Sequence, residues 1–169
     1  MEVSDLSFEE IYEHYADGVF QYIYFLVGEE RLAEDLTQET FVKAWWGLRA
    51  FKAESSYKTW LTTIARNTTY DHFKKKSALG FLPFLKQHEP VATYTPEIWL
   101  QQQYDQQELY AAIGRLKYEY REAIVLTKIE GFSAKEAATI LGWNVKKVHN
   151  AVERGMKTLG QLLGGDNNA

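Results

Sequence analysis

Apolar side chains recur every three or four residues along most of the chain, whereas the alternating pattern of a β-strand is scarce. This spacing is typical of one buried face of an α-helix, so the sequence predicts an all-α fold. We expect one helix that ends near Gly28, a second from about residue 30 to 46, and a third from a serine cap, Ser55 or Ser56, to about Lys76. The first helix has the clearest stripe, formed by Phe8, Ile11, Tyr12, Tyr15, Val19, Tyr22, Ile23 and Leu26.

The helical pattern is interrupted in the middle of the chain. All three prolines lie between residues 77 and 96, and proline breaks helices, so this stretch is interpreted as a linker. The sequence therefore predicts two small helical domains, residues 1–76 and 107–169, joined by a flexible linker at 77–106. We expect the apolar residues of the linker to dock against this protein or a partner; they are Phe81, Leu82, Phe84 and Leu85.

Composition excludes several classes of protein. With 15% aromatic residues and a net charge of −4, the chain is not expected to be disordered. It contains no cysteine, which excludes disulfides, thiolate metal sites and cysteine nucleophiles. No apolar run approaches the roughly 18 residues of a membrane span, and the acidic start of the chain does not resemble a secretory signal. We therefore expect a cytoplasmic protein that does not insert into a membrane.

Charge is distributed unevenly along the chain. Residues 1–40 contain eleven acidic side chains and one basic side chain, whereas residues 41–76 contain eight basic and two acidic ones. Residues 115–169 are basic again, with nine basic and six acidic side chains. This division indicates phosphate near the basic segments and a basic partner near the acidic one, but solvated helix faces of mixed sign would give the same pattern.

Residues 133–159 form the most specific local pattern. Ser133 and Glu136 have the spacing of a capping box that begins a short helix, and Gly142 can end it. Two helices joined by a short glycine turn are typical of a helix-turn-helix unit, whose second helix enters the major groove of DNA; a plain helical hairpin is the alternative. The second helix is expected to bury Val145, Val148, Val152 and Met156. Its outer face would carry Lys146, Lys147, His149, Asn150, Glu153, Arg154 and Lys157.

A second group of residues interleaves cations with aromatic rings between positions 49 and 76. Such pairings hold single-stranded nucleic acid, with the cations on the backbone and the rings on unstacked bases. Aromatic residues at helical spacing are more often part of a core, and we expect this for Trp60; Phe51, in a loop, is the better candidate for contact with a base. The cations are Lys52, Lys58, Arg66 and Lys74–Lys76, and the other rings are Tyr57, Tyr70 and Phe73.

The second predicted helix carries an acidic face, formed by Glu34, Asp35, Gln38 and Glu39. No histidine or further carboxylate is spaced for metal ligation, so this face is either solvated or a docking site for a basic protein. No glycine-rich phosphate loop and no nucleophile elbow are present, and the four histidines are scattered. These observations predict a protein that is not an enzyme and needs no cofactor or metal.

Together these motifs resemble the extracytoplasmic-function (ECF, group 4) sigma factors, which are two-domain subunits of bacterial RNA polymerase. Residues 33–41, AEDLTQETF, match the helix with which the family binds core polymerase. Phe51 and residues 55–67, followed by the lysine run, match its promoter-melting segment. Residues 116–159 match its C-terminal helix-turn-helix domain. The resemblance therefore covers nearly the whole chain.

The resemblance implies a transcription initiation factor that binds core RNA polymerase, directs it to specific promoters and promotes DNA melting. It assigns polymerase binding to Asp35, Gln38 and Glu39. It assigns capture of a flipped base and other contacts at the minus-ten element to Phe51, Lys52, Ser55, Ser56, Lys58 and Asn67. It assigns the minus-thirty-five element to Lys146, Lys147, His149, Asn150, Arg154 and Lys157. The implied partners are core RNA polymerase, promoter DNA and an anti-sigma factor, which can be membrane-anchored.

The chain departs from the family pattern in its recognition helix. Lys147, Asn150 and Ala151 stand where the family usually has threonine, serine and arginine, and Glu153 adds a negative charge, so we expect a weaker hold on phosphate. Lys117 stands where the family usually has proline, so that helix end can be built differently. The competing hypotheses are a free-standing helix-turn-helix regulator and a small helical enzyme. A regulator would bind duplex DNA alone, whereas a sigma factor needs polymerase.

Overall fold

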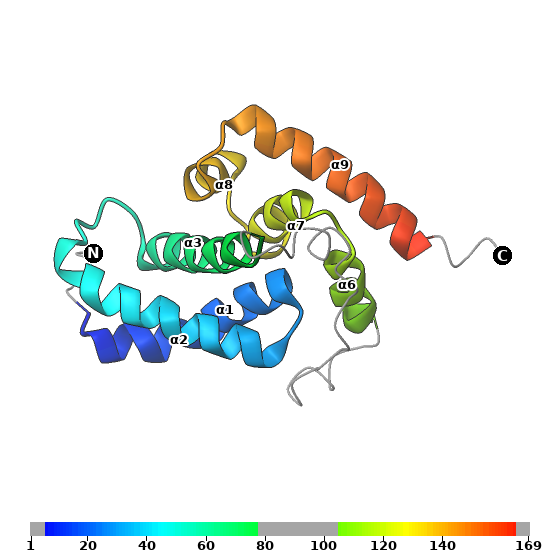
Figure 1. The fold of residues 1–169 in the computed structure, drawn as a ribbon. Helices are drawn as coiled ribbons and strands as arrows, with labels where there is room; N and C mark the ends of the chain where they lie inside the picture. Colours follow the sequence, from blue (N-terminus) through cyan, green and yellow to red (C-terminus); the bar gives the residue numbers. More distant parts are fainter. Residues whose placement is uncertain (1–5, 78–104, 165–169) are drawn as a thin grey trace.

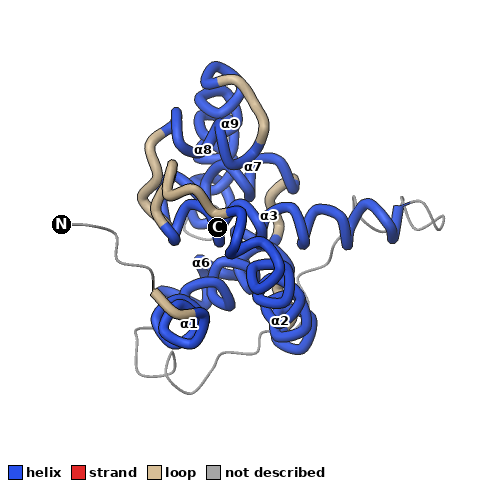
Figure 2. The backbone as a smooth tube through the Cα atoms, turned by 90° about the vertical axis from the view of Figure 1, so that its left-hand side faces the viewer, coloured by secondary structure: helices blue, strands red, loops and turns tan. Residues whose placement is uncertain are grey.

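The computed structural model describes residues 6–77 and 105–164, and these residues are helical with no β-strand among them (Figures 1 and 2). The all-α prediction is confirmed. The apolar part of the linker, residues 81–85, lies outside the described residues. In chain order the elements are α1 (Phe8–Val27), α2 (Glu30–Gly47), the 3₁₀ turn η1 (Leu48–Ala50), α3 (Tyr57–Lys76), α6 (Asp105–Gly114), α7 (Tyr118–Ile124), the π-helical η3 (Val125–Ile129), α8 (Ala134–Leu141) and α9 (Val145–Gly164).

The first unit consists of α1, α2 and α3, which pack against one another. A capping box begins α1, since the Ser7 Oγ accepts a hydrogen bond from the Glu10 backbone N–H and the Glu10 carboxylate accepts one from that of Ser7. Gly28 ends this helix with a φ of +70°, a left-handed conformation that favours glycine. Ser56, not Ser55, caps α3. These helices meet in a core that includes Ile11, Ile23, Leu26, Ala33, Leu61 and Ala65. In the stripe predicted for the first helix, Tyr12 is 46% exposed, so its assignment to the buried face was wrong.

The second unit is built around α7, α8 and α9, with α6 beside them (Figure 1). The predicted capping box of Ser133 and Glu136 begins α8, and Gly142, with a φ of +69°, ends it. Asn144 then caps α9, because its Oδ1 accepts a hydrogen bond from the Lys147 backbone N–H at 2.7 Å. Within residues 6–77 and 105–164, no helix is both long enough and apolar enough to cross a bilayer.

The buried stripe of α9 differs from the predicted one. Val145 and Met156 are 39% and 42% exposed, so their assignment to the inner face was wrong. The buried row shares Val148 with the predicted one but then continues one position earlier, through Ala151 and Gly155. Gly155 has no side chain, so α9 can lie close to α7 at this point. The residues that α9 buries are Val148, Ala151, Gly155 and Leu159.

Gly155 permits this close contact, and its replacement by alanine is expected to destabilise the protein by about 1–3 kcal/mol through overpacking. A Cβ at this position would lie 2.6 Å from the Ile124 Cδ1 and 3.0 Å from the Tyr120 Cβ. A Cβ at Gly160, later in α9, would meet nothing within 4 Å, so Gly160→Ala is the matched control and should stabilise the helix by up to about 1 kcal/mol. Urea unfolding followed by circular dichroism measures both changes. Equal stabilities of the two variants would contradict the packing described here.

Candidate protein and nucleic-acid interfaces

The acidic face of α2 lies in solvent. Asp35, Gln38 and Glu39 are all exposed, and the residues between them are buried because the helix repeats every 3.6 residues. The two threonines on the buried face form hydrogen bonds within the helix itself. The Thr37 Oγ1 donates a hydrogen bond to the Ala33 carbonyl at 2.6 Å, and Thr40 does the same to Leu36 at 2.7 Å. Glu39 also forms an ion pair of 3.4 Å with Lys43.

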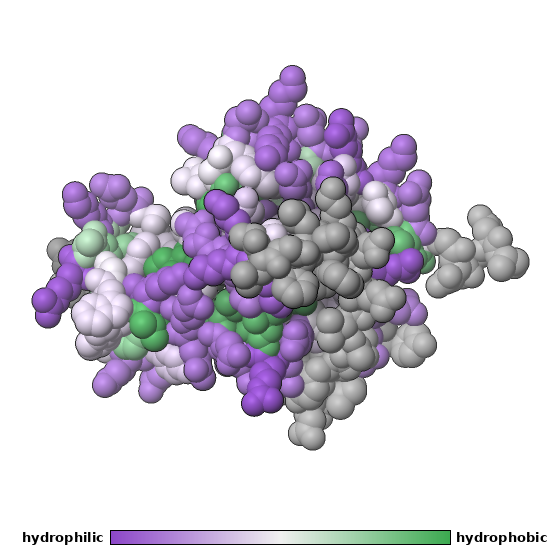
Figure 3. Space-filling view, in the orientation of Figure 1, coloured by the Kyte–Doolittle hydropathy of each residue, from purple (hydrophilic) through white to green (hydrophobic). Residues whose placement is uncertain are grey.

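The same exposed face of α2 becomes apolar toward its end. Val42 is 56% exposed and Trp46 77% exposed, and they follow Asp35 and Glu39 at helical intervals of three and four residues. Figure 3 shows pale and green residues gathered at this end of α1 and α2, whereas the surface over α8 and α9 is mostly hydrophilic. This stripe was not predicted from the sequence. Positions 35, 39, 42 and 46 are three or four residues apart, and this spacing could have shown that they share one face of the helix.

The loop after α2 holds an aromatic cluster. The Phe51 ring is stacked on that of Tyr57, with 4.8 Å between centroids, and lies 4.8 Å from that of Trp60. Phe51 is half-buried, so its ring packs against these two aromatic side chains and is also partly accessible at the surface of the loop. Lys52, Ser55 and Ser56 are exposed in the loop. Trp60 is also half-buried, in agreement with its predicted packing role.

Asn67 is exposed on α3, two turns after Trp60. Residues seven apart lie on the same face of a helix, so Trp60 and Asn67 border one strip of surface about 10 Å long. The half-buried Thr63 and Ile64 lie between them. The Phe51 ring thus lies beside Trp60, and Asn67 lies two turns further along the same face of α3; we call this surface, from Phe51 past Trp60 to Asn67, the strip.

Lys58 does not join that strip. Its Nζ donates a hydrogen bond to the Glu130 backbone carbonyl at 3.0 Å, forms an ion pair of 3.6 Å with the Glu130 carboxylate, and lies 5.1 Å from the centroid of the Phe132 ring. Burial raises the pKa of the Glu130 carboxyl, and the nearby Lys58 ammonium opposes this shift. A residue predicted from sequence to contact DNA is thus held by the second unit of the same chain.

The outer face of α9 is exposed and polar, as predicted. One of its cations is partly neutralised: the Lys147 Nζ lies 3.8 Å from a carboxylate oxygen of Glu119 and 4.2 Å from the centroid of the Trp143 ring. A groove of about 330 Å³ lies between the start of α7 and this face, and Tyr120, Asn150 and Arg154 line part of it. All the predicted minus-thirty-five residues are exposed, namely Lys146, Lys147, His149, Asn150, Arg154 and Lys157.

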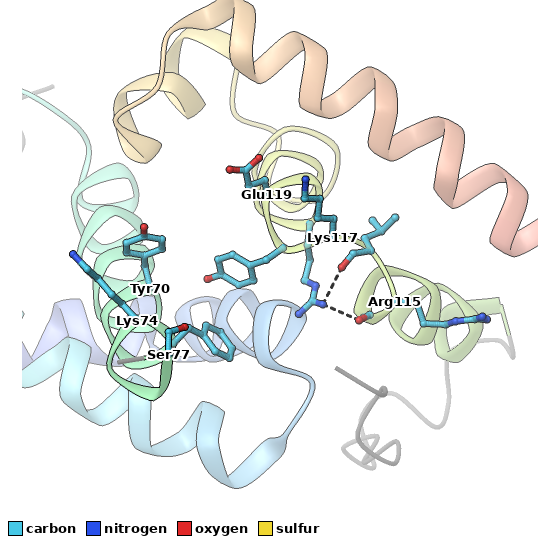
Figure 4. A pocket seen from close by; sticks show the side chains of 11 residues that line it. Tyr70, Lys74, Ser77, Arg115, Lys117 and Glu119 are labelled. Carbon is cyan, nitrogen blue, oxygen red and sulfur yellow. Dashed lines mark hydrogen bonds between the residues drawn. The ribbon is translucent and has the colours of Figure 1, made fainter. Parts of the chain in front are cut away.

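Residues 6–77 and 105–164 contain no group of three or more histidine and carboxylate side chains that could hold a metal ion. A cavity of about 660 Å³ lies between the end of α3 and the connection from α6 to α7. Figure 4 shows Tyr70, Lys74 and Ser77 on one side of it and Lys117 and Glu119 on the other. Residues of both units line this cavity.

Comparison with known proteins assigns both units. Residues 11–78 match Sigma-70 region 2, and residues 106–159 match Sigma-70 region 4. The ECF RNA polymerase sigma factor SigX of Bacillus subtilis is 30% identical over 158 residues, which cover 90% of this chain and 81% of SigX. The chain belongs to the ECF family of RNA polymerase sigma factors. It is therefore a transcription initiation factor that acts with RNA polymerase at promoters, and not an enzyme.

Two further relatives agree with this ECF assignment. The RNA polymerase sigma factor YlaC of Bacillus subtilis is 31% identical over 150 residues, which cover 88% of this chain and 87% of YlaC. Among solved structures, the sigma factor RpoE of Bartonella quintana, in complex with the anti-sigma factor NepR, superposes with a TM-score of 0.77. It is 28% identical, and the match covers 93% of this chain and 96% of RpoE.

Proposed function

We propose that residues 1–76 bind core polymerase and the minus-ten element, that residues 107–169 bind the minus-thirty-five element, and that residues 77–106 link them. The observation that carries the polymerase assignment is the exposed stripe of α2, in which Asp35, Gln38 and Glu39 point away from the core. These side chains are exposed and do not belong to the core, so their replacement should affect binding more than folding. Val42 and Trp46 extend the stripe and would supply its apolar contact.

The strip from Phe51 to Asn67 would bind one extruded base of the minus-ten element. The Phe51 ring can stack on the base, and the Asn67 amide can hydrogen-bond its edge, so that these contacts offset the few kcal/mol that extrusion costs. Lys52, Ser55 and Ser56 are exposed in the loop between them and would contact the adjoining backbone. Lys58 would join these contacts only after it separates from Glu130.

The outer face of α9 would read the minus-thirty-five element as duplex DNA. Its exposed cations suit phosphate contacts, and Asn150 can hydrogen-bond base edges in the major groove. Because the NepR complex of RpoE is similar to this chain over most of its length, we also propose that an anti-sigma factor binds this protein. Since RNA polymerase is its partner, the protein would act in the cytoplasm.

Free protein is expected to bind promoter duplex weakly, because a chain with a net charge of −4, whose recognition helix lacks the arginine usual in the family, releases few counterions from DNA. In vitro transcription with core polymerase on a small promoter library tests the proposed function, and a gel shift with and without polymerase is the accompanying measurement. Transcription that depends on both components supports the proposal. Tight, specific duplex binding by the free protein would favour a free-standing regulator.

A further inference from the structure

The loop between η1 and α3 contains one residue with an unusual backbone conformation. Ala53 has a φ of +54°, in the left-handed region, whereas the other residues with positive φ in the described part of the chain are glycines, at positions 28, 131 and 142. In this region the Cβ of an L-residue crowds the following carbonyl oxygen, so the conformation is strained for alanine and not for glycine. Such strain persists only where the surrounding structure holds the residue in place, and it is concentrated at functional sites.

The two ends of this loop are fixed. The Phe51 backbone N–H donates a hydrogen bond of 3.2 Å to the Leu48 carbonyl of η1. At the other end Ser56 caps α3, because its Oγ accepts a hydrogen bond of 3.1 Å from the Thr59 backbone N–H. Phe51 and Ser56 both have an ordinary extended backbone. The change in chain direction therefore falls on the residues between them, and the chain bends at residues 53–55.

This bend brings the Phe51 ring onto Tyr57. The two side chains are six residues apart, and an extended chain of that length would separate their backbones by about 20 Å. Their ring centroids are instead 4.8 Å apart, in a stacked arrangement, and Tyr57 is buried. The Phe51 centroid also lies 4.8 Å from that of Trp60, so the ring is held by two contacts. The direction of the chain at Ala53 therefore decides where the Phe51 ring lies.

Ala53 has no side-chain group that could contact DNA specifically. It is exposed, and its methyl group carries no hydrogen-bonding atom. Its contribution is its backbone conformation, because a right-handed or extended residue 53 would direct Phe51 away from Tyr57. Since the residue is exposed, a substitution there changes the loop without leaving a cavity in the core.

We propose that Ala53 is a positioning residue for base capture, whose left-handed turn holds the Phe51 ring on Tyr57 with part of the ring accessible to an extruded base. This proposal rests on the proposed binding of a minus-ten base by the strip. Phe51 is half-buried, so one ring can pack on Tyr57 and still be reached from the surface. A loop that is already folded need not be ordered when the base arrives, so less of the binding free energy is lost.

The test changes the tolerance of residue 53 for the left-handed region. Valine is branched at Cβ and strongly disfavours this region, whereas asparagine is enriched in it. Ala53→Val should remove the nuclear Overhauser effect between the Phe51 and Tyr57 rings in the free protein. It should also lower promoter opening by about tenfold, measured by permanganate footprinting with core polymerase. Ala53→Asn should retain both the ring contact and opening.

Three further measurements separate positioning from a general loss of stability. Gel shifts of the polymerase–promoter complex should show unchanged recruitment in Ala53→Val. Ala50→Val makes the same change on an exposed alanine of η1 that lacks the left-handed conformation, and it should leave the ring contact and opening unchanged. Adding Ala53→Val to Phe51→Leu should cause no further loss of opening, because residue 53 acts through the ring that is already missing.

A ring contact between Phe51 and Tyr57 that survives in Ala53→Val overturns the proposal. An equal loss of opening in the Ala50 and Ala53 variants does the same, as does a loss that adds in full to that of Phe51→Leu. Normal opening by Phe51→Leu itself would instead refute the proposed base-binding strip. The ring contact measured on the free variants would then still decide whether Ala53 positions Phe51.

Discussion

Replacing both Asp35 and Glu39 with alanine is expected to weaken binding to core RNA polymerase by about thirtyfold, or about 2 kcal/mol. Both carboxylates are exposed on α2, and neither contacts the core. The free energy of unfolding should therefore change by less than about 1 kcal/mol. The loss of affinity should be larger at low salt, where electrostatic attraction is less screened. Fluorescence titration with labelled core enzyme, at two salt concentrations, measures the effect.

Glu9→Ala with Glu13→Ala is the control for this double change, because both carboxylates are exposed on α1 and lie outside the acidic face of α2. Trp46→Ala tests the apolar half of the stripe and should weaken binding without the salt dependence. Unchanged affinity of the Asp35 and Glu39 double variant, at both salt concentrations, would show that polymerase docks elsewhere.

Changes at Phe51 and Asn67 are expected to impair strand opening and leave recruitment intact, since the base that they bind is available only after the duplex begins to open. Phe51→Ala should cost about 1–3 kcal/mol of stacking on the base. Asn67→Ala should relax the preference for one base of the minus-ten element, because a base edge loses its hydrogen-bond partner. Permanganate footprinting of polymerase complexes reports opening directly.

The structure sharpens the choice of variant at Phe51. Because this ring also packs against Tyr57 and Trp60, Phe51→Ala removes both packing and stacking. Phe51→Leu keeps most of the volume and removes the aromatic face, so it separates the two effects. Normal opening and unaltered base preference in both Phe51→Leu and Asn67→Ala would rule out the base-binding strip.

Local structure was accessible from the sequence because its causes are local. The helix spacing of apolar residues, the capping box of Ser133 and Glu136, and the glycines at positions 28 and 142 act within one or two turns of chain. Exposure of the acidic face of α2 followed from the same periodicity. Residues 33–41 and 116–159 resembled a known family for the same reason, since motif residues keep fixed spacings within an element.

Packing between elements was not accessible in this way. The buried stripe of α9 was predicted from its valines and Met156, but the residues that this helix buries are Val148, Ala151, Gly155 and Leu159. Which row of a helix is buried depends on the shape of the partner surface, here Ile124 and Tyr120, and that surface is distant in sequence. A pattern of apolar residues alone cannot specify such a match.

The sequence by itself determined the helices, their caps, the exposed charged faces and membership of the ECF sigma family. Only the tertiary structure decided that Arg66 is paired with Glu122, that Lys58 is held by Glu130, and that Phe51 joins an aromatic cluster. The partners in the two ion pairs are 56 and 72 residues apart along the chain. No local spacing encodes such pairs, because they form only when two separate helical units meet and lose water together.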